Sequence, residues 1–342
     1  MSDSTSAAPA VAGGELSREE AADAVVAELR SAERFLLTTH ESPDGDALGS
    51  LLAMQAVLTQ LGKDSVMYVA AKEFPLPVEY RFLPLEEVFH EPPADVVDRV
   101  HVFLDCGNID RTPEGFLRSS EARVVNIDHH HDNTRFGAIN LVDVAASSTA
   151  EIVYELARRL GAKVTPEIAS ALYVGLVTDT GRFSYDNTGP ATHRLAAELI
   201  EAGVDVGDTY RRLYERVPIE KLHLVARALG KIERYDECRL ALTYISAADY
   251  EETGASEVLT EGIIDHVRAL EGTGVAAVVR DRAEPAGSAR KVSLRSTDPG
   301  VDVSAIARRH GGGGHTRAAG FSTDLGYEEI VESLCAELAS AR

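Results

Sequence analysis

The sequence is poor in the residues that long nucleic-acid binders and disulfide-rich proteins use. It has no tryptophan, and aromatic residues make up 6% of its 342 residues. Proteins that hold long single strands usually stack bases on aromatic side chains along a basic groove, so we expect no such groove. The three cysteines, Cys106, Cys238 and Cys335, form no CxxC or Cys/His zinc spacing. We therefore expect no disulfide and no structural zinc, as suits a reducing cytoplasm.

Long apolar segments are absent as well. No run of apolar residues approaches the roughly 18 that a membrane-spanning helix needs. The opening segment, MSDSTSAAPAVAGGELSREE, lacks the basic region and the apolar core of a signal peptide. We expect a cytoplasmic protein without a membrane segment, in which residues 1–15 form a disordered tail.

Basic residues are outnumbered by acidic ones. The chain has 34 Lys and Arg against 55 Asp and Glu, which gives a formal net charge of −21. This charge repels the phosphate backbone of a long duplex, so we expect no long duplex nucleic acid as a partner. A nucleic-acid substrate should be short and held by a local basic site. Most of the acids are expected to form a solvated surface, except where they cluster with histidines.

The pattern of apolar residues predicts two domains. Hydrophobic residues make up 44% of the chain, which is long for a single core. Ser17 and Glu20 form a capping-box pattern, so a helix is predicted to run to about Ser31. Strand-like apolar runs then alternate with helix-like stretches, which predicts an α/β fold with a doubly wound, mostly parallel sheet.

A mostly helical segment follows the predicted sheet and leads into a smaller α/β domain. The helical segment has few glycine or proline breaks, so we interpret it as a helical linker. The predicted divisions are the tail (1–15), the first domain (16–207), the helical linker (208–236) and the smaller domain (237–342).

Acids and histidines gather where four apolar segments end. They are His40, Asp44 and Asp46 in TTHESPDGDALGS, Asp105 in VFLDCGN, Asp128, His129, His130 and His131 in VVNIDHHHDN, and Asp179 in ALYVGLVTDTGRFSY. In doubly wound sheets, ligands collect just beyond the carboxyl ends of the strands. The four segments can therefore converge although they lie far apart in the sequence.

The residue types predict a metal site with two ions. Carboxylates and imidazoles in this proportion suit Mn²⁺, with Mg²⁺ or Co²⁺ as substitutes, whereas a structural zinc site would favour thiolates. The candidate ligands outnumber what one octahedral ion needs. A carboxylate on a central strand can bridge two ions about 3.5–4 Å apart. Asp105, which has no paired acid beside it, is the bridging candidate.

Each segment alone has a simpler interpretation. A single aspartate such as Asp105 or Asp179 is usually a helix cap or a turn former. The DHHH run is also compatible with a solvated polar loop, and the PDGDA turn with a plain cap of the following helix. The occurrence of all four segments in this order favours the metal site.

A glycine run near the carboxyl end predicts a phosphate-binding loop. The run GGGG spans residues 311–314 and is followed by two cationic side chains. Glycines let backbone N–H groups approach an anion, and adjacent cations add charge-assisted hydrogen bonds. The alternatives are a flexible surface loop for the glycine run and an ordinary edge-strand residue for Arg295, near the end of KVSLRS. The candidate substrate-binding residues are Arg295, Gly313, Gly314, His315 and Arg317.

These residues resemble the motifs of a known family. HESPDGDALGS, the aspartate of VFLDCGN, IDHH and GLVTDTGRFSY resemble the four motifs of the DHH phosphoesterases. RRHGGGGHTRAAGF resembles the glycine-rich motif of the DHH-associated substrate-binding domain. The five motifs span nearly the whole chain after the tail. The resemblance implies that 16–207 is the catalytic DHH domain and 237–342 the substrate-binding domain.

The resemblance also implies a role for each site residue. His40 and Asp44 would hold one manganese ion, the other would be held by Asp46, His129 and Asp179, and Asp105 would bridge the two. Asp128 would orient its neighbours, and His130 would face the scissile phosphate, so both are catalytic candidates. His131 departs from the minimal signature and receives no role.

Within the family, the sequence is most similar to the bifunctional oligoribonuclease and pAp phosphatase group, also called nano-RNases. The resemblance implies hydrolysis of oligoribonucleotides of a few nucleotides to mononucleotides and of pAp to AMP. Some members also cleave linear or cyclic di-AMP, and a homodimer is plausible by the same resemblance. The preferred substrate, the cleavage polarity and the physiological metal stay open.

Three other functions stay open at this point. A manganese inorganic pyrophosphatase shares the motif that begins with histidine but carries a different, more basic terminal domain, which the GGGGH segment argues against. A processive single-strand DNA exonuclease would carry additional DNA-binding domains. A non-catalytic nucleotide-binding sensor would have lost a ligand, whereas every expected ligand is present.

Overall fold

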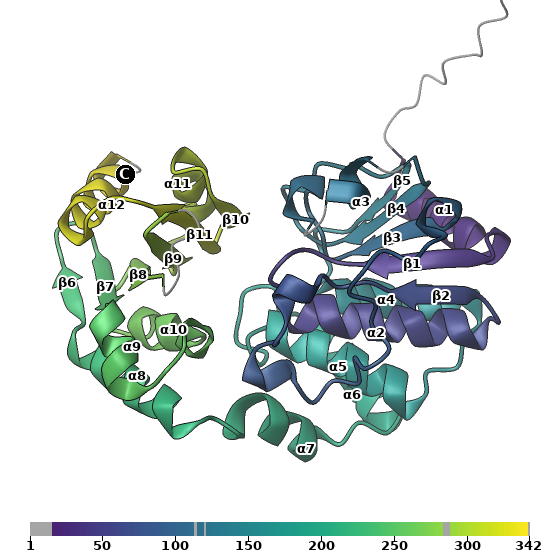
Figure 1. Ribbon diagram of the computed structural model, residues 1–342, viewed down its shortest axis with the longest axis horizontal. Coiled ribbons are helices and arrows are strands. Elements are labelled where there is room, and N and C mark those ends of the chain that lie inside the picture. Colours follow the sequence, from purple (N-terminus) through teal and green to yellow (C-terminus); the bar gives the residue numbers. More distant parts are fainter. Residues whose placement is uncertain (1–15, 113–114, 120, 283–287, 341–342) are drawn as a thin grey trace, which may run out of the picture. The chain divides into compact units, whose positions relative to one another are not determined.

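The computed structural model describes residues 16–112, 115–119, 121–282 and 288–340, and the predicted tail lies outside them. The chain folds into two compact units (Figure 1). The first comprises the chain up to Leu76 together with Phe82–Tyr210, and the second comprises Pro77–Arg81 together with Arg211–Arg342. The domain boundaries expected at 207 and 237 stay predictions.

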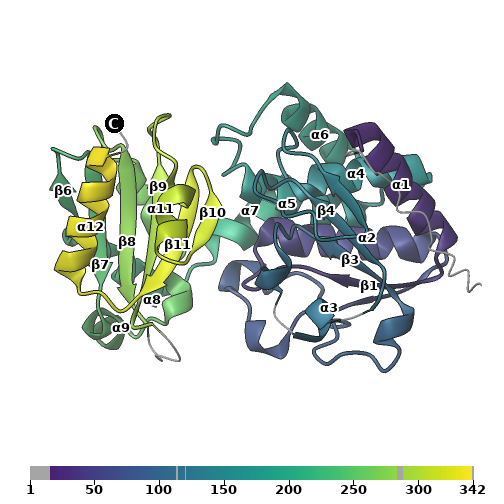
Figure 2. The same ribbon diagram turned by 90° about the horizontal axis from the view of Figure 1, so that it is seen from above.

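The first unit is built on a five-stranded parallel sheet (Figure 2). Its strands are β1 (Arg34–Thr38), β2 (Asp64–Met67), β3 (Val100–Leu104), β4 (Val124–Asp128) and β5 (Ile139–Val142). They lie in the order β2-β1-β3-β4-β5. The central strands are apolar and buried because helices cover both faces of a parallel sheet. The predicted doubly wound parallel sheet is confirmed.

Helices surround this sheet. They are α1 (Arg18–Ser31), α2 (Gly45–Gln60), α3 (Gly115–Ser119), α4 (Thr149–Leu160), α5 (Pro166–Asp179), α6 (Pro190–Glu201) and α7 (Val206–Tyr210). Short helical turns are η1 (Ala71–Glu73), η3 (Val96–Asp98) and η4 (Ile109–Arg111). Figure 1 shows α2, α4, α5 and α6 on one side of the sheet and α3 on the other. The predicted capping box of α1 is present, and the helix ends at Ser31 as expected.

Helices α2 and α5 pack unusually closely because a glycine lies at their contact. A Cβ atom on Gly49 would stand 2.3 Å from the backbone oxygen of Ala171. The close approach brings the start of α2 and the end of α5 together. It therefore sets the distance between the acids that these two helices carry.

The second unit contains a six-stranded mixed sheet in the order β10-β11-β9-β8-β7-β6. Its strands are β6 (Glu233–Tyr235), β7 (Leu240–Ile245), β8 (Val275–Asp281), β9 (Arg290–Ser296), β10 (Gly313–His315) and β11 (Ala318–Thr323). Its helical elements are η2 (Val78–Tyr80), the π-helical turn η5 (Arg211–Glu215), α8 (Ile219–Gly230), α9 (Ala247–Thr253), η6 (Glu257–Thr260), α10 (Ile263–Arg268), α11 (Val303–Arg309) and α12 (Tyr327–Ser340). Among the described strands of this sheet, β7 and β8 alone pair in parallel. This unit is the smaller α/β domain that the sequence predicts.

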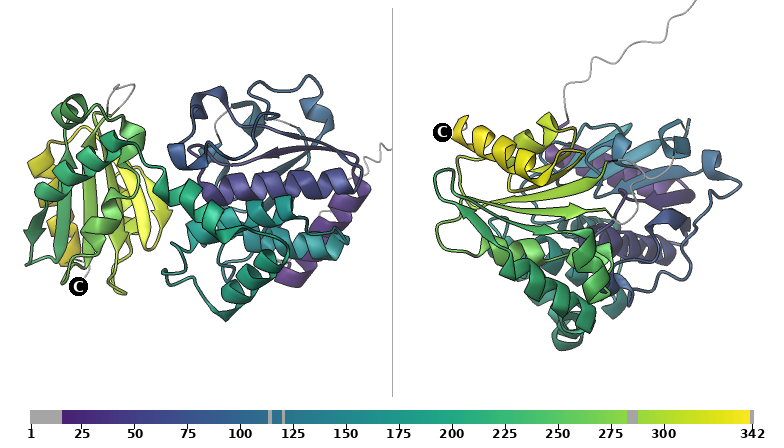
Figure 3. Two further views of the ribbon diagram at one scale, coloured as in Figure 1. Left: turned by 90° about the horizontal axis from the view of Figure 1, so that it is seen from below. Right: turned by 60° about the vertical axis from the view of Figure 1, so that its left-hand side comes forward.

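Two apolar layers cover the faces of this second sheet (Figure 3). Val292, Leu294 and Phe321 face the core that α11 and α12 close, whereas Ala276 and Val278 face α8 and α10. Along β9, buried and half-buried residues alternate, as a strand with two different faces requires. The half-buried face of β9 thus carries the polar side chains.

The segment 208–236, expected to be a helical linker, forms η5 and α8 and then the edge strand β6. Leu224 and Ala228 of α8 are buried in the second unit. Across the described ranges, no helix combines the length and the apolar character that crossing a membrane demands.

Candidate metal centre and phosphate-binding residues

The three central strands of the first sheet deliver acids and histidines to one edge. His40 follows β1 by two residues, Asp105 comes directly after β3, and Asp128 is the last residue of β4. These side chains are buried, as is His129 after β4. The carboxyl ends of neighbouring parallel strands meet at one edge, so residues far apart in sequence come together here.

The side chains form two overlapping triplets that share Asp105. One ligand atom each from His40, Asp44 and Asp105 lie within 4.8 Å of one another. The same holds for Asp46, Asp105 and His129. A shared carboxylate between two groups of ligands is the arrangement that a bridging residue requires.

Asp179 joins the second triplet from the end of α5. The Nε2 atom of His129 lies 3.5 Å from the Oδ2 of Asp179, 3.7 Å from the Oδ1 of Asp105 and 4.0 Å from the Oδ2 of Asp46. The structure therefore brings together all six residues expected as metal ligands. Their role as ligands stays a proposal.

The carboxylate of Asp44 can cap helix α2 and also belong to the first ligand triplet. Its Oδ1 accepts hydrogen bonds from the backbone N–H groups of Asp46 and Ala47, at 3.0 and 3.1 Å, and so caps α2. The simpler interpretation of this turn as a helix cap is thus correct. The cap uses one carboxylate oxygen and leaves the other available to the triplet.

The amino end of α4 holds the buried carboxylates in place, and the sequence reasoning missed it. The backbone N–H groups of Thr149 and Ala150 donate to the two oxygens of Asp46, at 2.6 and 2.9 Å. The hydroxyl of Thr149 donates to the Oδ1 of Asp105 at 3.0 Å. The helix dipole favours negative charge at this point. The signal in the sequence was the capping pattern around Ser148.

The acids of the cluster disturb one another's ionisation. Burial raises the pKa of Asp46, and the charges of Asp105 and Asp179 raise it further. Burial likewise raises the pKa of Asp179, to about 7. Burial lowers the pKa of His129, but the carboxylates of Asp179 and Asp105 outweigh it and raise that pKa to about 10. Buried carboxylates that repel one another need positive charge, so the site fits divalent cations.

Asp105 lies in a strained backbone conformation. Its φ angle is +58°, a left-handed value that residues other than glycine seldom adopt. Burial would raise its pKa, but the neighbouring imidazole of His40, whose Nε2 lies 3.7 Å from the Oδ2 of Asp105, and the charge of His130 outweigh it, so the pKa lies well below its usual range. Strain of this kind persists where the surroundings fix a functional side chain.

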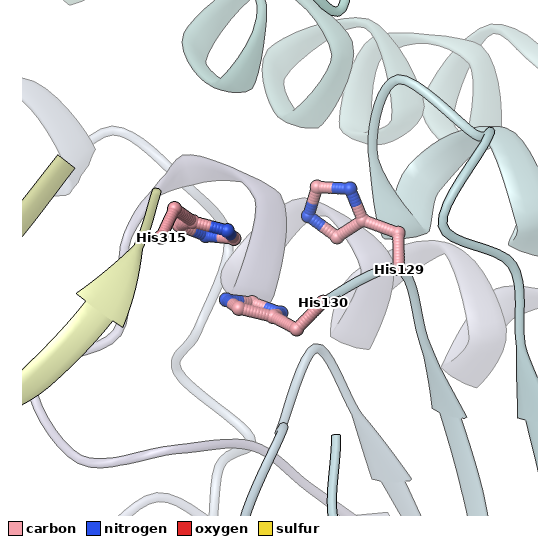
Figure 4. Close-up of side chains that lie close together, drawn as sticks. All are labelled: His129, His130 and His315. Carbon is pink, nitrogen blue, oxygen red and sulfur yellow. The ribbon is translucent and has the colours of Figure 1, made fainter. Parts of the chain in front are cut away.

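A hydrogen-bond chain orients His130. Its Nδ1 lies 2.7 Å from the Oδ1 of Asp128, whose Oδ2 accepts from the side-chain amide of Asn133 at 2.6 Å. Burial lowers the pKa of His130, but the bond to Asp128 outweighs it and raises that pKa. Figure 4 shows His129 and His130 leaving the end of β4 with their rings neighbouring one another. His131 is exposed.

Comparison with known proteins identifies the family. Residues 34–176 match the DHH family, N-terminal domain, and residues 241–341 match the DHHA1 domain. The bifunctional oligoribonuclease and PAP phosphatase NrnA of Thermus thermophilus is 35% identical over 315 residues, which cover 89% of this chain and 90% of that protein. The chain belongs to the DHH family.

Two further relatives agree with the assignment to the DHH family. The bifunctional oligoribonuclease and PAP phosphatase NrnA of Bacillus subtilis is 29% identical over 323 residues, with 89% of this chain and 96% of that protein covered. The crystal structure of an exopolyphosphatase-related protein from Bacteroides fragilis has the same fold, with a TM-score of 0.83 and 24% identity. That match covers 94% of this chain and 96% of the other. The protein is a DHH-family phosphoesterase, a hydrolase of phosphoester bonds.

The glycine run of the DHHA1 domain is only in part the loop that we expected, because Gly311 and Gly312 alone lie outside regular structure. Gly313 and Gly314 lie in β10, which pairs with β11, so the prediction of a loop is wrong for these two residues. A Cβ atom on Gly312 would stand 2.1 Å from the backbone oxygen of Gly320, and one on Gly314 2.5 Å from that of Ala318. The glycines allow close strand approach, and Gly313 remains exposed.

The strand register places Arg295 and His315 on one face of this sheet. His315 is paired with Ala318, and Ala318 is paired with Arg295 on β9. Directly paired residues project to the same face, so the two cationic side chains flank a small residue. Arg317 lies in the turn between β10 and β11 and donates to the backbone oxygen of Asp298. Arg317 is thus anchored within the second unit.

Proposed function

We propose that the protein is a two-manganese phosphoesterase that hydrolyses oligoribonucleotides of a few nucleotides to mononucleotides and pAp to AMP. The observation that carries this proposal is the pair of overlapping ligand triplets centred on Asp105. The 35% identity to a protein named as an oligoribonuclease and PAP phosphatase supports the choice of substrate. A cytoplasmic location and a homodimer are part of the same proposal.

The six ligand candidates divide between two ions. His40 and Asp44 would hold the first ion, the second would be held by Asp46, His129 and Asp179, and Asp105 would contact both. When bound, two such ions lower the pKa of a water molecule and neutralise charge on phosphate oxygens. The amino end of α4 keeps Asp46 and Asp105 oriented for this role.

His130 would act on the substrate itself. Its Nδ1 is held by Asp128, which fixes the orientation of the ring, and the imidazole would stabilise charge on the transferred phosphoryl group or protonate the leaving oxygen. Asp128 would position the ring and hold its charge without reacting. The buried setting strengthens both interactions because little water competes.

The second unit would hold the rest of the substrate. Arg295 and His315 offer cationic groups on one sheet face, beside the exposed backbone of Gly313, and we propose that they bind phosphate. Gly314 and Arg317 would support this surface. The net charge of −21 opposes binding of a long duplex, which limits the nucleic acid to short strands.

The test is product analysis with purified protein after chelation and addition of Mn²⁺. The substrates are a diribonucleotide, a long RNA, pAp, linear and cyclic diadenylate, and inorganic pyrophosphate. We expect mononucleotides from the dinucleotide and AMP from pAp, with pyrophosphate intact and no turnover in chelator. The Asp105→Asn variant serves as the inactive control.

Other outcomes would select another function. Hydrolysis of pyrophosphate alone would make the protein a pyrophosphatase. Binding of nucleotides without turnover, despite bound metal, would make it a sensor. Preferential cleavage of cyclic or linear diadenylate would keep the reaction class and change the main substrate.

A further inference from the structure

Three cationic side chains gather at one end of the β8–β9 hairpin in the second unit. Arg280 on β8 is paired with Lys291 on β9, so the two side chains project to the same face. Arg282 lies two residues beyond Arg280, and its backbone N–H donates to the backbone oxygen of Ala289, which continues the pairing. Arg282 therefore belongs to the same face. We call Arg280, Arg282 and Lys291 the hairpin cations.

The hairpin cations are only partly neutralised. The Nε of Arg280 lies 3.3 Å from a carboxylate oxygen of Glu257, and the Arg280 side chain is 13% exposed. Among the residues that the structure describes, the side chain of the half-buried Lys291 forms no hydrogen bond or ion pair. The Nε of Arg282 is buried and has no hydrogen-bond partner within the described ranges. This end of the hairpin thus presents donors that the described part of the chain leaves unused.

A third unused group lies on α9 of the same unit. The hydroxyl of Tyr250, on α9, is buried and also lacks a hydrogen-bond partner in the described part of the chain. Tyr250 packs in the same core layer as Val278, two residues before Arg280 on β8. Burial raises the pKa of this hydroxyl, and the charge of Arg280 opposes that rise. Buried polar groups without partners are uncommon in folded proteins and call for a ligand or solvent.

Electrostatics favour an anion at this place. Like charges directly opposite each other on paired strands repel, and here Arg280 faces Lys291. Burial lowers the pKa of Lys291, and the charge of Arg280 lowers it further. The charges of Glu257 and Glu261 raise this pKa, but two carboxylates do not balance the three hairpin cations. A bound anion would relieve the repulsion and occupy the unused donors.

The hairpin cations continue the surface that carries Arg295. Lys291, Ser293 and Arg295 alternate with buried residues along β9 and share its half-buried face. Ser293 is paired with Gly320, and Gly320 with Gly313, so only small residues lie between the two cationic ends. A strand rises roughly 3.4 Å per residue, which places the backbones of Lys291 and Arg295 about 14 Å apart. An extended chain of a few nucleotides fits such a row.

We propose that the hairpin cations bind a second phosphate group of the nucleotide substrate. This phosphate lies farther along the nucleotide strand than the phosphate held by Arg295 and His315. This inference rests on the proposed function and deepens it, because it makes the β9 face a selector of substrate length. Longer substrates reach the second position, whereas a dinucleotide is held by the first alone. The same phosphate chemistry would also suit a separate nucleotide effector.

The experiment compares charge-removing variants of the full-length protein. Lys291→Gln and Arg282→Gln each remove one hairpin cation, and Lys291→Arg restores the charge. Arg234→Gln is the matched control, because Arg234 lies on the opposite edge strand β6 and pairs with Asp236 at 2.9 Å. Thermal unfolding followed by circular dichroism establishes that all variants fold as the wild type does.

The readouts are kcat and KM for a di- and a pentaribonucleotide with Mn²⁺, and equilibrium binding of both in chelator. For Lys291→Gln and Arg282→Gln we expect the KM and the Kd of the pentanucleotide to rise about tenfold, because each variant loses one charge-assisted contact with phosphate. We expect kcat and the dinucleotide values to stay unchanged, Lys291→Arg to recover the wild-type values, and Arg234→Gln to match the wild type.

The other outcomes separate a failure of this inference from a failure of the proposed function. Variants that match Arg234→Gln remove the hairpin cations from substrate binding but leave the proposed function intact. Inhibition or activation by AMP that disappears in Lys291→Gln, with unchanged KM for the pentanucleotide, would assign the position to an effector. A wild-type protein that cleaves neither RNA would refute the proposed function, while binding in chelator would still decide the role of Lys291.

Discussion

At the scale of single residues, the orientation of His130 depends on Asn133, a side chain that bonds Asp128 rather than His130 itself. Asn133 donates to Asp128 and also to the side-chain oxygen of Asn126, at 2.7 Å. Asp128 is fully buried, so its carboxylate cannot exchange these bonds for water. The position of the His130 ring therefore rests on Asn133.

Replacing Asn133 with alanine should lower kcat about 10- to 100-fold with little change in KM, because the group that orients a catalytic side chain is lost. Steady-state kinetics with a dinucleotide would measure both values. Asn140→Ala is the matched control, since Asn140 bonds Gly137 in a turn of the same unit. A raised KM with unchanged kcat would show that Asn133 acts on substrate binding instead.

At the scale of elements, the α2–α5 contact sets the positions of Asp46 and Asp179. Gly49→Ala places a methyl group 2.3 Å from a backbone oxygen that cannot move away by itself. Overpacking of this kind typically costs about 1–3 kcal/mol, so we expect a lower unfolding temperature and weaker Mn²⁺ binding. Calorimetry and metal titration would test this. Gly207→Ala, also in the first unit, meets only an ordinary contact and should change neither value.

Asp249 ties α8 to α9 through a buried carboxylate. It accepts hydrogen bonds from Lys231 at 2.5 Å and from Arg227 at 2.8 Å. Burial would raise its pKa, but these hydrogen bonds outweigh it and lower that pKa. Because the folded pKa is lowered, the stabilisation is complete above the ordinary value of about 3.9 and is lost as the pH falls below it.

Asp249→Asn should therefore destabilise the second unit by about 2 kcal/mol at neutral pH, the typical worth of hydrogen bonds to a charged group. Urea unfolding between pH 7 and pH 3 would measure the difference, which should shrink toward the acidic end. Glu252→Gln is the control, because Glu252 pairs with Arg227 but is 57% exposed. An equal effect of the two substitutions would contradict the role of burial.

At the scale of the whole molecule, the two units have separate cores. All six ligand candidates belong to the first unit, whereas the proposed phosphate-binding residues belong to the second. Metal binding should therefore stabilise one unit and leave the other unchanged. We expect two transitions in thermal unfolding for this reason.

Saturating Mn²⁺, at about 100 times its Kd, should stabilise the first unit by about 2.7 kcal/mol and raise its transition temperature. The transition of the second unit should stay in place. Differential scanning calorimetry with and without chelator measures both. The Asp105→Asn variant should lose the shift, and a shift of both transitions would show that the two units unfold together.

The sequence by itself determined the features that depend on local pattern. The capping box at Ser17 fixed the start of α1, and the apolar runs that end at Asp105 and Asp128 predicted buried strands with acids at their ends. The fold class followed from the alternation of strand and helix patterns. The family followed from motif order, and the comparisons confirmed it. Periodicity, caps and motifs are properties of short segments, so a sequence displays them directly.

Only the tertiary structure decided which groups support the site. The bond from the backbone of Thr149 to Asp46 joins residues 103 positions apart, and no short pattern encodes it. The glycine run looked like a loop when its own residues were considered alone. Gly313 and Gly314 form part of β10 because they pair with β11, which lies on the other side of a turn. The pairing of Arg280 with Lys291 likewise follows from strand register. Contacts between distant segments depend on how whole elements pack, and packing is decided by the sum of many weak contacts rather than by any one segment.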